Sequence, residues 1–72
     1  MPRQRSRQGI AVGTRYRHRD APNLTWEVIA LYIGVDQKRH AVLSNISDPT
    51  WLKTISVIEL EQSGDYEGVP TL

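Results

Sequence analysis

Short runs of β-branched and aromatic residues, separated by turn-forming residues, restrict what this chain can fold into. The strongest run is residues 24–34, where Trp, Val, Ile, Tyr and Thr dominate and Gly34 closes the run. Similar runs are found at residues 10–19, 39–45, 53–58 and 66–69. Turn-rich segments at residues 20–23, 35–38 and 47–50 lie between them, and residues 59–61 suit a short 3₁₀ turn. This pattern predicts an all-β domain, a small five-stranded antiparallel barrel or a strongly curved sheet.

Alternation along two of these runs predicts which side chains are covered. In residues 10–19, the expected covered face carries Thr14, Tyr16 and His18, and arginines occupy the opposite face. Gly13 in the same run indicates a bulge or a close approach of another backbone segment. Residues 24–34 have Trp26, Val28, Ala30 and Tyr32 on one face and Ile29, Leu31 and Ile33 on the other. Since both faces are largely apolar, we expect this strand to be covered on both sides or sharply bent.

The size and composition of the chain limit it to one small domain. Its 72 residues include no cysteine, so disulfides and thiolate metal sites are excluded. The two histidines, His18 and His40, are too few for a structural zinc site, and we expect no metal and no cofactor. The longest apolar run, residues 28–33, is far shorter than the roughly 20 residues of a membrane span. We therefore expect a soluble cytoplasmic protein that makes no membrane contact.

Positive charge is concentrated at the start of the chain. Residues 1–19 carry a charge of +6 from six arginines and contain no acid, namely Arg3, Arg5, Arg7, Arg15, Arg17 and Arg19. Residues 20–72 hold three basic and eight acidic residues, a net charge of −5. Residues 1–9 offer little to bury and are predicted to form a disordered basic arm. The predicted domain covers residues 10–69, and residues 70–72 form a tail.

Two short motifs carry a resemblance to known proteins. Tyr16-Arg17-His18, followed after a loop by Trp26-Glu27-Val28, resembles the opening of an uncharacterised group of short bacterial and phage proteins. The order of short strands is similar to that of the small barrels of the Src-homology-3, Tudor and KOW type. The resemblance implies a Src-homology-3-like barrel and no assigned activity.

The arginines and one tryptophan are the candidate functional residues. Arginine donates two parallel hydrogen bonds to phosphate, and basic strands beside exposed aromatic residues bind nucleic acid. The predicted nucleic-acid-binding residues are therefore Arg3, Arg5, Arg7, Arg15, Arg17, Arg19 and Trp51. The alternative interpretation of the arginines is a solvated surface. Trp51, in a turn after Pro49, is interpreted either as a binding residue or as a lid over one end of the barrel.

No catalytic role is predicted. His18 and His40 lie in no recognised nucleophile spacing, and no glycine-rich phosphate loop is present. We expect neither catalytic residues nor a small-molecule substrate. Two functions follow: a non-enzymatic accessory module that binds nucleic acid, or a module for protein interaction or self-association with no nucleic-acid contact. In the second, the barrel surface would bind a peptide or another copy of the chain by strand addition or in an aromatic groove. A third interpretation is self-association, in which the basic arm of the same or a neighbouring chain pairs with the acidic end, namely Glu59, Glu61, Asp65 and Glu67.

Overall fold

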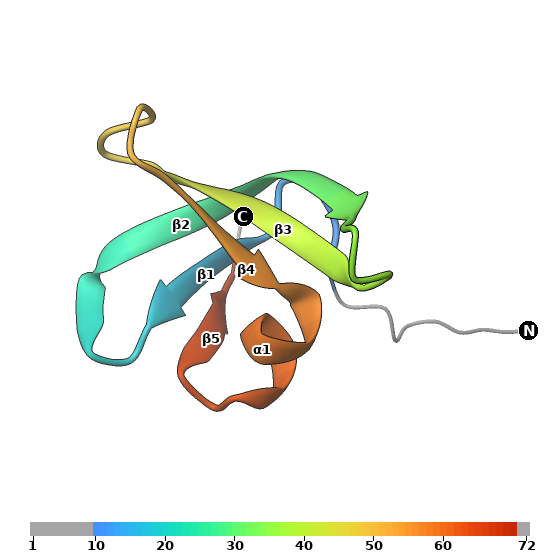
Figure 1. Cartoon of the computed structure of the whole chain (residues 1–72). Coiled ribbons are helices and arrows are strands. Elements are labelled where there is room, and N and C mark those ends of the chain that lie inside the picture. Colours follow the sequence, from blue (N-terminus) through green and yellow to red (C-terminus); the bar gives the residue numbers. More distant parts are fainter. Residues whose placement is uncertain (1–9, 71–72) are drawn as a thin grey trace, which may run out of the picture.

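The computed structural model describes residues 10–70 as a curved antiparallel sheet with one short helix. Its elements, shown in Figure 1, are β1 (Arg15–His18), β2 (Ala21–Ile33), β3 (Arg39–Asn45), β4 (Leu52–Ser56), α1 (Val57–Gln62) and β5 (Tyr66–Val69). The predicted strands at residues 39–45 and 66–69 are confirmed in type and extent. The predicted arm, residues 1–9 with Arg3, Arg5 and Arg7, lies outside the described residues, as do residues 71–72 of the tail.

The five strands form one sheet in the order β4-β3-β2-β1-β5. Every paired neighbour is antiparallel. The connections within the pairs β1–β2, β2–β3 and β3–β4 are too short for a parallel crossover, whereas β1 and β5 are paired although they lie far apart in the sequence. Strands β4 and β5 are its two edges, so the described sheet is not closed. Of the two predicted architectures, a barrel or a strongly curved sheet, the structure has the curved sheet. Figure 1 shows β2 and β3 crossing over β1, β5 and α1 as the sheet bends. The prediction of a mostly antiparallel β domain is confirmed, but it did not include the helix α1.

The long central strand β2 changes face in its middle. The pairing with β3 shifts between Val28 and Ala30, which leaves Ile29 as an extra residue. A bulge of this kind bends the strand and moves later side chains to the other face. As a result Val28 is buried and Leu31 packs against the core, while Ile29 is exposed. The predicted bend is therefore present, but the simple alternation expected for residues 24–34 is wrong beyond Val28.

The pairing of β1 with β2 is also irregular, and the turn predicted at residues 20–23 differs from the one in the structure. Arg17 pairs with Thr25, but the next pair is His18 with Ala21, so β2 begins at Ala21 and the turn itself is two residues. Pro22 lies in the extra segment of β2 opposite this shift. Proline lacks the N–H that a regular ladder needs, and bulges tolerate it for that reason.

The segment before β1 is a turn and not part of the predicted strand. Gly13 has φ of +99°, a backbone conformation that favours glycine. Its N–H donates to the carbonyl oxygen of Val28 at 2.8 Å, and the Val28 N–H donates to the Thr14 carbonyl at 2.9 Å. The close backbone approach predicted at Gly13 is therefore confirmed, outside a strand.

Strand β4 ends at Ser56 because the next residues start a helix. The Ser56 hydroxyl accepts a hydrogen bond from the Glu59 N–H at 3.1 Å, the arrangement of a helix N-cap. The sequence Ser56-Val57-Ile58-Glu59 matches the Ser-x-x-Glu pattern of a capping box. The prediction of a strand through residue 58 and a 3₁₀ turn at 59–61 is therefore wrong.

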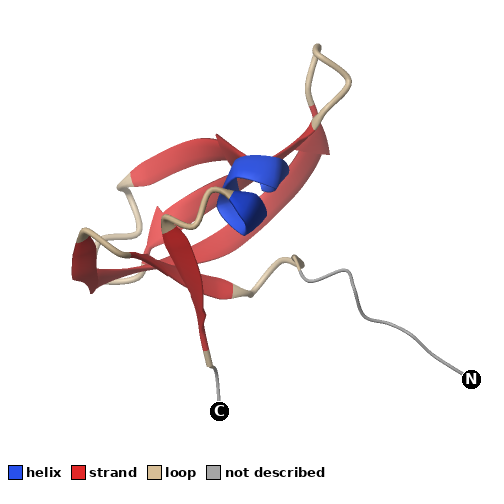
Figure 2. Cartoon of the chain, turned by 90° about the horizontal axis from the view of Figure 1, so that it is seen from below, coloured by secondary structure: helices blue, strands red, loops and turns tan. Residues whose placement is uncertain are grey.

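The core lies between the concave face of the sheet and α1, which Figure 2 shows against one side of the strands. Tyr16 and Trp26 come from the sheet and Val57 and Leu60 from the helix; the buried cluster also contains Ile10, Val28, Ala41 and Leu43. Burial raises the pKa of the Tyr16 phenol, and the nearby Glu61 carboxylate raises it further. Tyr16 is thus a neutral core residue, as its predicted face required.

Replacing Leu60 by Ala tests the role of α1. Leu60 is 1% exposed, so we expect Leu60→Ala to lower the free energy of unfolding by about 2–5 kcal/mol. The matched control is Ile58→Ala, on the same helix and 58% exposed, with an expected change within about 0.5 kcal/mol. Urea unfolding followed by circular dichroism measures both. Equal losses of stability would mean that residues 57–62 do not pack in this orientation.

Candidate binding face

The sheet has a second face, turned away from α1, that we call the outer face. Arg15 pairs with Glu27 across β1 and β2, Glu27 with Ser44, and Ser44 with Leu52 across β3 and β4. Because alternate residues point to opposite faces, this row lies on the side opposite Tyr16 and Trp26. The outer face therefore crosses the sheet from β1 to β4.

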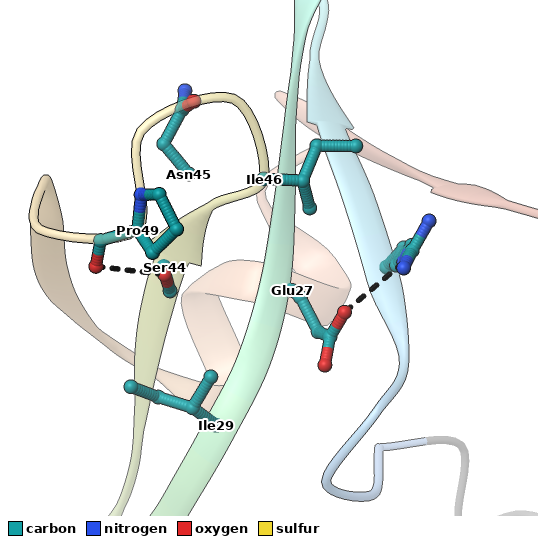
Figure 3. Close-up of a pocket in the computed structure, with 7 residues that line it drawn as sticks. Glu27, Ile29, Ser44, Asn45, Ile46 and Pro49 are labelled. Atoms are coloured by element: carbon teal, nitrogen blue, oxygen red, sulfur yellow. Dashed lines mark hydrogen bonds and ion pairs between the residues drawn. The ribbon is translucent and has the colours of Figure 1, made fainter.

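A pocket of about 270 Å³ opens on the outer face. Figure 3 shows its side chains drawn from β1, β2, β3 and the loop that follows β3. Its apolar walls are Ile29, Ile46 and Pro49, and its polar groups come from Arg15, Glu27, Ser44 and Asn45. Apolar walls with a few fixed polar groups are typical of binding sites. The exposed bulge residue Ile29 is thus placed in a pocket wall.

The wall formed by the β3–β4 loop is held by hydrogen bonds. The Asn45 Oδ1 accepts from the N–H groups of Ser47 and Asp48 at 2.9 and 3.0 Å. The Ser44 hydroxyl donates to the Pro49 carbonyl at 3.1 Å (Figure 3). Asn45 is buried, and its Nδ2 has no hydrogen-bond acceptor among residues 10–70. The Asx turn at Asn45 therefore fixes where Ile46 and Pro49 stand.

Of the predicted arginines, the structure describes three, and two of them lie beside carboxylates. Arg15 Nε donates to Glu27 Oε1 at 3.1 Å. Arg17 Nε lies 3.4 Å from Glu67 Oε2 in an ion pair without hydrogen-bond geometry. Such partly exposed pairs are worth about 0–1 kcal/mol each. The charges of Arg15 and Arg17 are thus matched on the outer face by two acids.

Arg19 and Trp51 lie apart from this pocket. Arg19 Nε donates to the Gly64 carbonyl beyond α1. Trp51 meets Trp26 edge to face, with ring centroids 5.1 Å apart, and is 49% exposed. Lys53 Nζ lies 4.2 Å from the Trp26 ring centroid and 5.1 Å from that of Tyr66. Trp51 therefore covers a core residue and still presents an open surface, on the face opposite the pocket.

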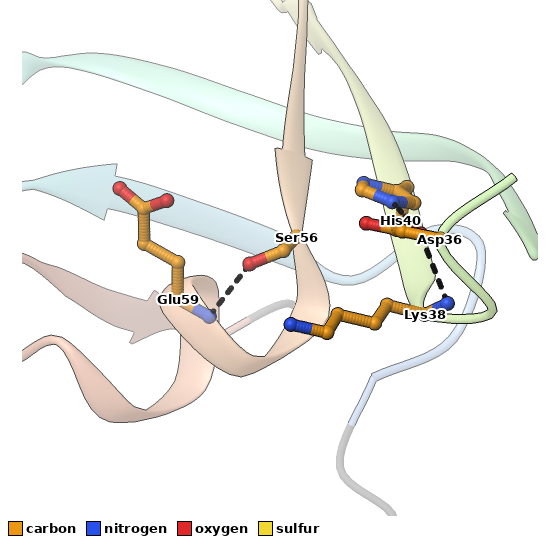
Figure 4. Close-up of polar contacts among 5 residues, drawn as sticks. All are labelled: Asp36, Lys38, His40, Ser56 and Glu59. Atoms are coloured by element: carbon orange, nitrogen blue, oxygen red, sulfur yellow. Dashed lines mark hydrogen bonds and ion pairs between the residues drawn. The ribbon is translucent and has the colours of Figure 1, made fainter. Parts of the chain in front are cut away.

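Both histidines have structural contacts. His18 packs edge to face on Tyr66 at 4.8 Å, and His40 stacks on Tyr32 at 5.3 Å, both distances joining ring centroids. His40 Nε2 lies 3.1 Å from Asp36 Oδ1, which also accepts from the Lys38 N–H at 3.0 Å (Figure 4).

A glycine allows the close packing of this hairpin. A Cβ at Gly34 would come within 2.7 Å of the His40 ring and 2.9 Å of Asp36 Oδ1. The turn after β2 is thus a tightly packed structural unit.

Neither a metal centre nor a known relative identifies the site. Within residues 10–70, no three His, Asp or Glu side chains gather closely enough to hold a metal ion. The six-residue α1 is too short to cross a bilayer, and no helix in residues 10–70 is longer than α1. Comparison of the chain with protein-family models, curated proteins and solved structures gives no match.

Of the residues that line the pocket, Arg15 alone is among the binding residues predicted from the sequence. The sequence pattern places Ile29 on a strand face and Pro49 in a turn, and neither position by itself predicts a site. The signals were a run of apolar residues that breaks alternation and an Asn three residues before Asp-Pro. Neither signal shows by itself that the two segments meet.

The Asp36 contacts predict an acid-dependent contribution to stability. Hydrogen bonding from the Lys38 N–H, and then from His40, lowers the pKa of Asp36. A lowered folded-state pKa stabilises the fold above the unfolded value of about 3.9, and this contribution is lost as the pH falls through the folded value. Asp36→Asn should therefore flatten the fall in melting temperature on acidification. A carboxyl titration by NMR gives the direct measurement, and an Asp36 pKa at or above that of a model peptide would contradict the expectation.

Proposed function

We propose that this chain is a non-enzymatic protein-interaction module and that a partner docks on the outer face of its sheet. The observation that carries the proposal is the pocket between Ile29, Ile46 and Pro49, beside the Arg15–Glu27 pair. A Src-homology-3-like architecture, as the sequence resemblance implies, belongs to this proposal. The strand order and the short helix before the last strand are in keeping with it.

The apolar side chains of the outer face favour a protein partner. Ile29 and Ile46 line the pocket and are 44% and 42% exposed, and Leu52, the cross-strand neighbour of Ser44, is 51% exposed. Exposed aliphatic groups gathered around a pocket and edged by polar groups are typical of protein-binding surfaces. A phosphate backbone would gain little from them.

A peptide library displayed on phage and selected against the folded domain tests this proposal. We expect the selected peptides to bind the native chain. Their affinity for the Ile46→Asp variant should be at least about tenfold weaker, because peptide binding would remove water from a carboxylate in the apolar wall. Val35→Asp, which changes a fully exposed residue at the β2–β3 turn, is the matched control and should bind normally. Peptides that bind both variants equally, or a selection that yields none from a chain that is monomeric in solution, would overturn the proposal.

The charge division of the sequence supports a second candidate function, nucleic-acid binding through residues 1–19. Six arginines without an acid form a strong attraction for phosphate. Since Arg15 and Arg17 each pair with a carboxylate, we assign the main attraction to Arg3, Arg5 and Arg7, together with Arg19.

Electrophoretic shifts at several salt concentrations test this second function. Binding should weaken steeply with salt, and combined replacement of Arg3, Arg5 and Arg7 by Ala should reduce the log–log salt slope by about one for each phosphate that an arginine no longer neutralises. Arg39→Ala, on β3, removes one charge elsewhere and is the control. The absence of any shift at low salt for single-stranded and duplex DNA or RNA would exclude the function.

A further inference from the structure

We infer that the partner on the outer face is a second copy of this chain, joined as a two-fold symmetric dimer. This inference rests on the proposed function and names its partner. In such a dimer the same patch of each copy faces the other. Every contact across the interface therefore occurs twice, with the roles of the two copies exchanged. The patch consists of Arg15, Glu27, Ile29, Ile46, Pro49 and Leu52.

The arrangement of charge on the patch is self-complementary. Arg15 and Glu27 are cross-strand neighbours on adjacent strands, with side chains 41% and 34% exposed. A two-fold axis that lies in the plane of the interface, parallel to the strands and midway between these two side chains, places Arg15 of one copy over Glu27 of the other, and the reverse. Only one nitrogen of Arg15 is occupied, since Nε donates to Glu27 and no other described residue accepts from its guanidinium. The remaining N–H groups of the guanidinium can bind a carboxylate of the second copy.

The balance of charge also argues against a strongly charged partner. Each of two arginines on β1 has an acidic neighbour on an adjacent strand: Arg15 is paired with Glu27 on β2, and Arg17 with Glu67 on β5. These two ion pairs together carry no net charge. A strongly acidic or basic surface would meet repulsion as well as attraction on such a face. A second copy instead presents the same two charges in reversed order.

The apolar content of this small domain is the other support. Within residues 10–70, eight hydrophobic residues are buried and nine large hydrophobic residues are exposed. A chain of this size buries a modest share of its surface, and this one has no disulfide to add stability. Pairing the outer faces would cover Ile29, Ile46 and Leu52 of both copies.

Charge reversal with mixing tests the dimer. Sedimentation of the native chain over a range of concentrations should show a monomer–dimer equilibrium. Arg15→Glu and Glu27→Arg should each weaken the dimer at least about tenfold, because like charges then face each other across the axis. An equimolar mixture of the two variants should restore it, since both cross-axis pairs become opposite in charge while each chain keeps a repulsive pair within itself.

The mixture separates an intermolecular role from an intramolecular one. If Arg15 and Glu27 act only within the chain, the mixture stays monomeric and the inference is overturned. A native chain that is monomeric at every concentration overturns it as well. Circular dichroism establishes that both variants fold; if either does not, Ile46→Asp replaces the charge variants and should abolish the dimer, while Val35→Asp preserves it. A monomer that still binds selected peptides at Ile46 would retain the proposed function and exclude the second copy.

Discussion

The one extra residue in β2 is the feature on which the rest of the structure depends. With Ile29 left out of the ladder, Trp26 and Val28 before it and Leu31 after it all reach the same core. A regular strand would have sent Leu31 to the outer face. The same irregularity bends the sheet toward α1 and exposes Ile29, so a single insertion both closes the core and supplies a wall of the outer pocket.

The strands were predictable because their signal is local. Residues 39–45 and 66–69 combine β-branched or aromatic residues with flanking turn residues, and the structure assigns them as expected. The helix was missed although its capping pattern, Ser56 to Glu59, is present in the sequence. Val57 and Ile58 favour a strand by composition, and the cap with the burial of Leu60 outweighs that preference.

The outer pocket was not predictable from local pattern because it joins segments far apart in the chain. Arg15 is one of six arginines clustered in the sequence, but its partner Glu27 is twelve residues away and is brought beside it by the β1–β2 register. Ile46 and Pro49 reach the pocket only because Asn45 holds the backbone that follows it. Such positions depend on pairing and loop geometry, which composition does not encode.

The ammonium group of Lys53 protects one edge of the open sheet. Strand β4 is an edge, and its Lys53 side chain is directed inward, onto the Trp26 and Tyr66 rings. An inward-pointing charge on a border strand discourages the addition of further strands, a safeguard that natural sheets use against fibril growth. The unpaired backbone of β4 is thereby protected against pairing with a strand of another molecule.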